Sequence, residues 1–238
     1  MARTLNYHLG SLLNRIGYRV MRNDRIPQCT LNILKLGIRF LQSKKETLTI
    51  IQIGAFDGEL ADPLKNAFLE ATNRVILVEP QSKPYEILVN KYSDFSHIFV
   101  ENSAVGEIDG ELELFLPKGE QYSPIASLDS THLSNFGIKT SAVKSITVNS
   151  ITVTSLLRNY EIDSVDVLQI DTEGFDFQIL TNFFNANVEP LVINLEVYHL
   201  SRQERTDLRK ILRDRDYQYV EHGFDLFALK SEALGKEL

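Results

Sequence analysis

The stretch Ile50-Ile51-Gln52-Ile53-Gly54-Ala55-Phe56-Asp57-Gly58 decides the fold, together with Arg74-Val75-Ile76-Leu77-Val78-Glu79-Pro80 further along the chain. An apolar run stops at a turn that contains glycine, a helix-length gap follows, and a second apolar run ends at a carboxylate. Doubly wound sheets bind ligands outside the carboxyl ends of their strands. The layout therefore predicts a nucleoside-cofactor site, in which Gly54 and Gly58 allow close approach and Glu79 accepts the ribose hydroxyls.

The spacing of the glycines indicates which cofactor this site takes. A dinucleotide site uses Gly-x-Gly-x-x-Gly, whose middle glycine admits a pyrophosphate. Here Phe56 stands at that middle position and Asp57 places an acid in the turn. An acid is a poor neighbour for a pyrophosphate and a better one for an ammonium or sulfonium group, both of which S-adenosylmethionine carries. The turn favours methyl transfer over hydride transfer, although a lone Gly-x-x-x-Gly also occurs in βαβ turns without a ligand.

Three more short patterns follow in order. They are Asn102-x-Ala104-x-Gly106 after the third expected strand, Ser127-Leu128 in an inserted segment, and Ile170-Asp171-x-Glu173-Gly174 at the end of the fourth. With these patterns, and from about Thr47 to Lys230, the sequence resembles the FkbM-type methyltransferases, which are class I enzymes that use S-adenosylmethionine. No single pattern is specific, whereas the five in this order are.

The resemblance implies O-methylation of a hydroxyl on a sugar, polyketide or similar natural product, so the expected partner is a small-molecule or glycan acceptor. We expect S-adenosylmethionine to be bound by residues of the glycine turn and of the strand ends: Gly54, Ala55, Phe56, Asp57, Gly58, Glu79, Pro80, Asn102, Ser103, Ala104 and Asp171.

Two positions depart from the family pattern. Gln169 stands where a Lys is usual, and Val153-Thr154 stands where Leu-Asp is usual. We expect Thr154 to cap the following helix, because a hydroxyl accepts an N-terminal N–H much as a carboxylate does. The departures leave open a second class of function, a non-catalytic protein that keeps the fold as a scaffold and recruits a partner through its basic N-terminal region.

The hydrophobic periodicity predicts an α/β fold. Strands are expected at 48–53, 74–79, 97–101, 165–170, 191–196, 217–221 and 225–229, and helices near 60–71, 83–92, 152–160, 174–184 and 201–214. Ser201-Arg202-Gln203-Glu204 is typical of a capping box for the last helix. Strands that alternate with helices indicate a mostly parallel sheet.

The end of the chain and an insert refine this fold. His222-Gly223-Phe224 is short enough only for an antiparallel hairpin between the last two strands. The fold class is therefore a class I methyltransferase (Rossmann-like), mostly parallel sheet with an antiparallel closing hairpin, plus an N-terminal helical segment. A polar insert at about 106–147, with strands of its own at 111–116 and 144–148, is expected to cover the site.

Carboxylates at two neighbouring strand ends are the candidate catalytic groups. Asp171 and Glu173 follow the fourth strand, Glu196 ends the fifth, and His199 comes three residues later. We expect Asp171 to orient the acceptor hydroxyl, with Glu173 and Glu196 in support and His199 as base or ligand. Asp171 and Glu196 are also candidate metal ligands, and an oxygen-rich set without cysteine suits Mg²⁺ or Mn²⁺.

Each of these groups also has a structural interpretation. Glu173 is a candidate cap for the following helix, Glu196 a candidate partner for an Arg, and His199 a candidate packing residue. His97 and His132 show no constellation in the sequence.

Composition sets the remaining bounds. The 238 residues, 43% of them hydrophobic, suffice for a full core in one domain. A single cysteine, Cys29, excludes a disulfide framework and indicates a reducing, cytoplasmic setting. No apolar run approaches the roughly 18 residues of a membrane span. The oligomeric state stays open.

Residues 1–45 differ in charge from the rest of the chain, with nine Lys or Arg and one acid, Asp24. Apolar residues recur at helical spacing from Leu5 to Val20, and a second helical stretch runs from Leu31 to Leu41. We expect a basic amphipathic helical extension at 1–45 and the methyltransferase domain at 46–238. A cap on the domain is favoured over a peripheral membrane contact. Nucleic acid is not an expected partner, because an acidic domain repels phosphates.

Overall fold

The computed structural model describes residues 33–58, 64, 70 and 72–234. Ile33–Leu238 forms one compact unit. The helices expected around Leu5–Val20 and near 60–71 lie outside the described residues, apart from the isolated positions Leu64 and Glu70. No helix in the described part of the chain is both long and apolar enough to cross a bilayer.

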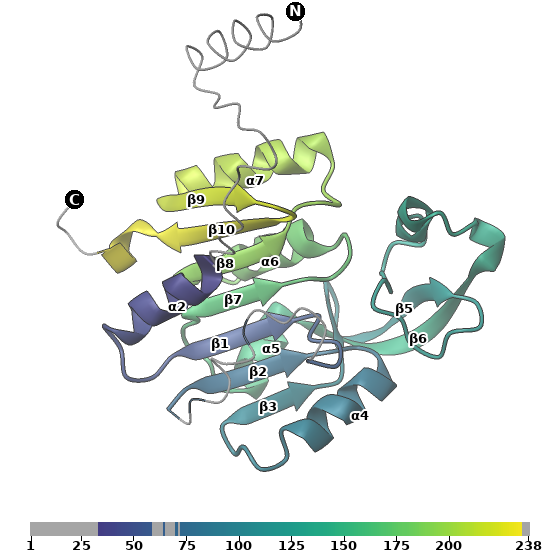
Figure 1. Ribbon diagram of the computed structural model, residues 1–238, viewed down its shortest axis with the longest axis horizontal. Coiled ribbons are helices and arrows are strands. Elements are labelled where there is room, and N and C mark those ends of the chain that lie inside the picture. Colours follow the sequence, from purple (N-terminus) through teal and green to yellow (C-terminus); the bar gives the residue numbers. More distant parts are fainter. Residues whose placement is uncertain (1–32, 59–63, 65–69, 71, 235–238) are drawn as a thin grey trace, which may run out of the picture. The chain divides into compact units, whose positions relative to one another are not determined.

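A seven-stranded sheet forms the centre of this unit, in the order β3-β2-β1-β7-β8-β10-β9 (Figure 1). The strands are β1 (Thr49–Ile53), β2 (Arg74–Val78), β3 (Ile98–Glu101), β7 (Val167–Ile170), β8 (Val192–Glu196), β9 (Tyr217–His222) and β10 (Asp225–Lys230). Pairs from β3 to β8 are parallel, whereas β10 pairs antiparallel with both β8 and β9. The mostly parallel sheet and its antiparallel closing hairpin are confirmed.

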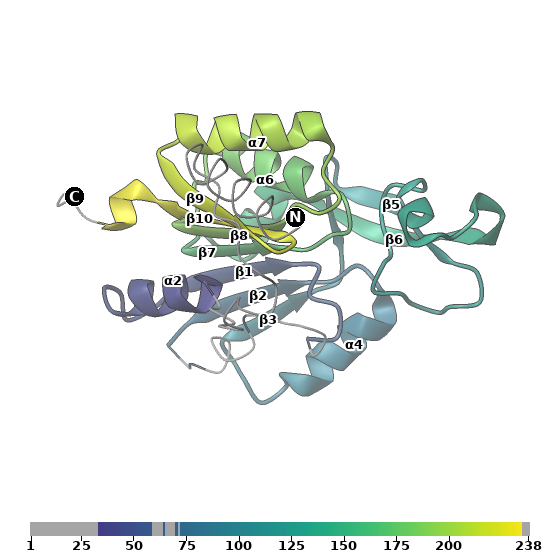
Figure 2. The same cartoon turned by 45° about the horizontal axis from the view of Figure 1, so that its top comes forward.

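Helices cover both faces of the sheet (Figure 2). Helices α2 (Ile33–Gln42) and α4 (Ser82–Lys91) lie on one face, and α5 (Val153–Asn159), α6 (Asp176–Asn185) and α7 (Arg202–Asp214) lie on the other. Successive strand residues point to opposite faces, so Ile50 packs with the α2 and α4 side chains and Ile51 with those of the other three helices. Burial on both faces explains why these strands read as continuous apolar runs.

Helix α2 belongs to the core of the same unit. Its Leu34, Ile38 and Leu41 are buried among sheet residues. Gly37 allows this close packing, because a Cβ there would lie 2.7 Å from the ring of Phe227 in β10. The expected domain boundary, after residue 45, therefore follows α2 in the sequence, whereas the compact unit already includes α2 and begins at Ile33.

Two helix starts test the capping predictions. The capping box of α7 is confirmed, with the Ser201 side chain and Glu204 each bonded to the other's backbone. The prediction that Thr154 caps α5 is wrong. Thr152 is the cap, because it leaves β6 in an extended conformation and its hydroxyl accepts the Ser155 N–H over 3.1 Å. Thr154 lies inside the first turn of α5, two residues after the N-cap, so its side chain is not at the capping position.

The insert forms a second, three-stranded sheet in the order β4-β6-β5. Its strands are β4 (Ala104–Gly106), β5 (Gly110–Pro117) and β6 (Val143–Thr152), and the short 3₁₀ helix η2 (His132–Phe136) lies between β5 and β6. The two expected insert strands are therefore confirmed. In both views this sheet lies beyond the carboxyl ends of β1, β2 and β7 (Figures 1 and 2).

Candidate active site

A pocket lies at the carboxyl ends of the central strands. It is lined by eight of the residues expected to bind the cofactor or to take part in catalysis: Gly54, Phe56, Glu79, Pro80, Ser103, Ala104, Asp171 and Glu173. Apolar residues of the insert, among them Leu114, Pro124 and Leu128, also line it. Ala55, Asp57, Gly58 and Asn102 are not among the lining residues.

Glu79 is a buried carboxylate at the end of β2, with 2% of its surface exposed. One of its oxygens accepts the main-chain N–H of Phe56 over 3.0 Å, and the other accepts the main-chain N–H of Gln81 over 2.8 Å. Burial raises the pKa of Glu79 to about 7, although these hydrogen bonds oppose the rise. The acid therefore organises the glycine turn and still faces the pocket.

Gln81 is a site residue that the sequence analysis missed. Its side-chain amide donates to Glu79 over 3.2 Å and to the Ser123 carbonyl over 3.0 Å, and its side-chain oxygen accepts the Ser123 N–H over 2.7 Å. The side chain thus ties the strand-end acid to the insert. A polar residue directly after Glu79-Pro80, at the N-cap of α4, was the available signal.

The two glycines of the turn have different roles. Gly54 has φ +80°, and a Cβ there would lie 1.8 Å from the main-chain oxygen of Asp171. Its close approach is thus to the neighbouring strand end. Gly58 has φ +64° and lies against Leu88 and Lys91 of α4. The positive φ values explain both glycines as turn residues.

The loop after β3 is fastened to the loop after β2. The Asn102 side chain donates to the carbonyls of Glu79 and Pro80, over 2.9 and 3.2 Å. Ser103 donates to Glu101 over 2.6 Å. Asn102 therefore does not line the pocket itself but holds the main chain of two residues that do, Glu79 and Pro80.

Gln169, which replaces the usual Lys, lies in the buried interior of the sheet. Its side-chain oxygen accepts the Asn194 amide of the adjacent strand β8 over 2.9 Å. The residue is not part of the pocket lining.

The chemistry of the lining fits an adenosine with a cationic tail. Apolar side chains such as Val78, Leu114 and Leu128 suit the faces of a purine, and Glu79 at the strand end suits a ribose diol. Asp171 and Glu173 place negative charge at another part of the lining, where a sulfonium or ammonium group would be stabilised. The residues present therefore fit S-adenosylmethionine.

Carboxylates crowd the rim formed by the ends of β7 and β8. Ligand oxygens of Asp171, Glu173 and Glu196 all lie within 4.8 Å of one another. Loss of hydration, and then repulsion from neighbouring acids, raises the pKa of Asp171 to about 7 and that of Glu196 to about 8, although Asp171 is still exposed at the rim. The expected convergence of these three acids is what the structure shows.

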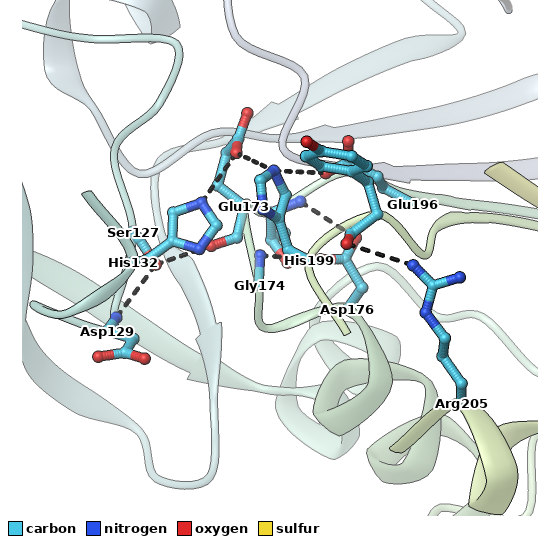
Figure 3. Close-up of polar contacts among 11 residues, drawn as sticks. Ser127, Asp129, His132, Glu173, Gly174, Asp176, Glu196, His199 and Arg205 are labelled. Atoms are coloured by element: carbon cyan, nitrogen blue, oxygen red, sulfur yellow. Dashed lines mark hydrogen bonds and ion pairs between the residues drawn. The ribbon is translucent and has the colours of Figure 1, made fainter. Parts of the chain in front are cut away.

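Two histidines meet Glu173 at this rim (Figure 3). The Nε2 atoms of His132 and His199 lie 3.0 and 3.3 Å from the same Glu173 oxygen. The centroids of the two imidazole rings are 4.3 Å apart. Burial, followed by the proximity of His132, lowers the pKa of His199. The prediction that His132 has no constellation is wrong, because the insert folds back and brings it to the loop after β7.

The hydrogen bonds and contacts of the acids show whether Glu173 caps a helix and whether Glu196 pairs with an Arg. Glu173 does not cap α6, whose N-cap is Phe175 without a side-chain hydrogen bond. The buried Asp176 instead accepts the N–H groups of Thr172 and Gly174, which fixes the loop after β7. Glu196 has no Arg partner among the described residues, and its Oε2 lies 3.7 Å from the His199 Nε2.

Comparison with known proteins places these features in context. The profile of the family described as Methyltransferase FkbM domain matches residues 52–219. Protein arginine N-methyltransferase 7 of Drosophila erecta is 31% identical over 114 residues, and this stretch spans 44% of the chain but only 16% of that protein.

Solved structures give weaker likenesses. An rRNA methylase from Streptococcus thermophilus has a TM-score of 0.46 at 8% identity, over 85% of this chain and 98% of that one. A precorrin-6y C5,15-methyltransferase from Geobacter metallireducens has a TM-score of 0.42 at 10% identity, over 88% and 91%. Neither likeness adds to the fold described above.

Proposed function

The chain belongs to the FkbM methyltransferase domain family, and from that premise we propose that it methylates a hydroxyl of a sugar, polyketide or similar natural product with S-adenosylmethionine. One observation carries the proposal: the pocket has a ribose-type acid, Glu79, at the end of β2 and an acidic rim at the end of β7.

Each candidate site residue has a specific role in this proposal. S-adenosylmethionine, when bound, supplies an electrophilic methyl group. Glu79 accepts the ribose hydroxyls, and Asp171 orients the acceptor hydroxyl for in-line attack. Glu173 and Glu196 support Asp171, and the departing proton goes to Asp171 or to His199.

A hard cation is a variant of this proposal. Asp171 and Glu196, with Glu173 beside them, would hold Mg²⁺ or Mn²⁺ through oxygen atoms alone. Such an ion lowers the pKa of a coordinated hydroxyl and makes proton removal easier.

Exposed aromatic rings beside the acidic rim support an uncharged acceptor. Tyr198 and Phe224 are 58% and 62% exposed, with ring centroids 4.7 Å apart, and Tyr198 lies 4.9 Å from the His199 ring. The ring centroid of Phe136 lies 5.4 Å from that of His199. Such rings offer apolar area to the carbon faces of a sugar or polyketide.

A second candidate is N-methylation of a guanidinium group. The crowded carboxylates of Asp171, Glu173 and Glu196 favour it, because they would pair with a cationic acceptor. The arginine N-methyltransferase relative is consistent with this candidate over its short matched stretch. A non-catalytic scaffold is the third candidate, and it predicts cofactor binding without turnover.

Transfer of a labelled methyl group from S-adenosylmethionine tests these candidates. Hydroxyl-bearing sugars and polyketides are compared with arginine peptides as acceptors. We expect label on a hydroxyl compound, and loss of that label in Asp171→Asn but not in the control Asp207→Asn, which changes an acid of α7 outside the pocket lining. Label on arginine peptides alone would favour the second candidate, and full activity of Asp171→Asn would remove Asp171 from the mechanism.

A further inference from the structure

Three segments far apart in the sequence bring two imidazoles and a carboxylate to one point. His132 comes from η2 of the insert, Glu173 from the loop after β7, and His199 from the loop after β8. Both Nε2 atoms face one oxygen of Glu173, at 3.0 and 3.3 Å (Figure 3). From this arrangement we infer that His132, Glu173 and His199 bind one divalent transition-metal ion.

The distances between the ligand atoms match those around such an ion. With metal–ligand bonds of about 2.1 Å, neighbouring ligand atoms are about 3.0 Å apart in an octahedron and about 3.4 Å apart in a tetrahedron. The two histidine–carboxylate distances fall in this range. One ligand atom from each residue lies within 4.8 Å of the others, so a single ion reaches all three.

The burial of the group separates it from a solvated cluster of acids. The side chains of His132 and His199 are 4% and 6% exposed, and that of Glu173 is 18% exposed. Glu196 provides a second, independent observation. Its Oε2 is buried without a hydrogen-bond partner among the described residues and lies 3.7 Å from the His199 Nε2. An unsatisfied buried oxygen is costly, and a cation held beside it by His132, Glu173 and His199 would stabilise it electrostatically.

The loop after β7 is shaped to present Glu173 to the histidines. Ser127 of the insert donates to the Glu173 carbonyl over 2.8 Å. Gly174 has φ +104°, and a Cβ there would lie 2.9 Å from the His132 ring. A side chain at this position would therefore displace His132.

The types of ligand decide the class of ion. Imidazole nitrogens favour zinc, iron, cobalt or nickel, whereas magnesium favours oxygen atoms alone. This set therefore differs from the all-oxygen set of Asp171 and Glu196, although the two share Glu173. In this assignment His199 is a ligand, and proton removal falls to Asp171. The inference does not depend on methyl transfer, since the ion binds whether or not an acceptor is present.

Metal binding by the full, tag-free chain tests the inference. After treatment with a chelator, the protein is titrated with Zn²⁺ by calorimetry and with Co²⁺ by visible absorption. We expect one Zn²⁺ per chain, Co²⁺ bands that Zn²⁺ abolishes, and no competition from millimolar Mg²⁺. His132→Ala and His199→Ala should each weaken Zn²⁺ binding at least tenfold, whereas His97→Ala should leave it unchanged.

Several results would overturn the inference. These are the absence of saturable Zn²⁺ binding by the wild type, unchanged affinity in both histidine variants, or loss of the ion in Asp171→Asn alone. Circular dichroism spectra establish that each variant is folded. If an alanine variant unfolds, the wild-type protein still tests the inference through its Zn²⁺ stoichiometry and its Co²⁺ spectrum. A Co²⁺ spectrum typical of oxygen ligands alone would contradict ligation by the two histidines.

Discussion

The main-chain N–H of Phe56 donates to the Glu79 carboxylate over 3.0 Å, which fastens the turn after β1 to the end of β2. Phe56 itself has a positive φ of 45°, so the turn is held in a conformation that non-glycine residues adopt infrequently. Glu79 therefore holds the turn after β1 in place, in addition to its proposed role in binding the ribose.

The turn should not tolerate a side chain at Gly54. Gly54→Ala should lower the free energy of unfolding by roughly 3 kcal/mol or more, since a left-handed residue is combined with a clash against Asp171. Gly137→Ala is the matched control, because Gly137 has φ +74° with nothing within 4 Å of an added Cβ. It should cost only about 1–2 kcal/mol. Urea unfolding measures both, and equal losses would show that the contact with β7 is unimportant.

The insert should loosen when Gln81 is truncated. Gln81→Ala removes the hydrogen bonds to Glu79 and Ser123 and should cost about 1–3 kcal/mol, because buried partners are left unpaired. Hydrogen exchange at the Ser123 amide should become faster. Gln178→Ala, which removes an exposed amide bonded to Glu107, should change neither quantity. Unaltered exchange at Ser123 in Gln81→Ala would contradict the proposed link.

Glu79 should give stability and cofactor affinity opposite dependences on pH. Its pKa is raised from 4.5 to about 7 by burial, so the folded state holds the proton more tightly than the unfolded chain. Its contribution to stability is therefore present below pH 4.5 and lost as the pH rises through about 7. The ribose hydroxyls donate to the ionised form of Glu79, so cofactor affinity should rise as the pH approaches about 7. Below this pKa the affinity should increase by up to about tenfold per pH unit.

Glu79→Gln should remove both pH effects, because an amide does not titrate. Thermal unfolding of the free protein and calorimetry with S-adenosylhomocysteine measure them separately. A wild-type affinity that is flat from pH 6 to pH 8 would argue that Glu79 does not bind the ligand as a carboxylate.

Residues 1–32 should not attach the protein to anionic lipid. They contain five Arg and one Asp, but the chain as a whole carries a net charge of −7. We expect no sedimentation of the intact chain with anionic vesicles at physiological salt. Removal of residues 1–32, which leaves α2 in place, is the control. Vesicle binding that disappears with this segment and weakens with salt would reverse the expectation.

The parts of the fold that follow from local patterns were predictable. The strands around Ile50 and Val75 appear in the sequence as apolar runs, and the length of the loop at Gly223 permits only a hairpin. Asp171 and Glu196 could be placed at one rim because the carboxyl ends of adjacent parallel strands meet there.

Contacts made by the insert could not be predicted in the same way. His132 lies 41 residues before Glu173, and no local pattern indicates that η2 folds back to the loop after β7. Gln81 is similar, since its bonds to Ser123 depend on how the insert packs. The cap of α5 was misplaced because Thr152 and Thr154 are both capping residue types, and only the end of β6 decides between them.

Calorimetric titration of the chain with S-adenosylmethionine, S-adenosylhomocysteine and NAD tests the central claim most directly. We predict saturable binding of the first two at one site per chain and no comparable binding of NAD. Glu79→Ala should weaken binding by at least roughly ten- to a hundredfold, because the loss of even one charge-assisted hydrogen bond to the ribose costs about 1.5–3 kcal/mol. Equal affinity in wild type and Glu79→Ala, or tighter binding of NAD than of S-adenosylmethionine, would contradict the account.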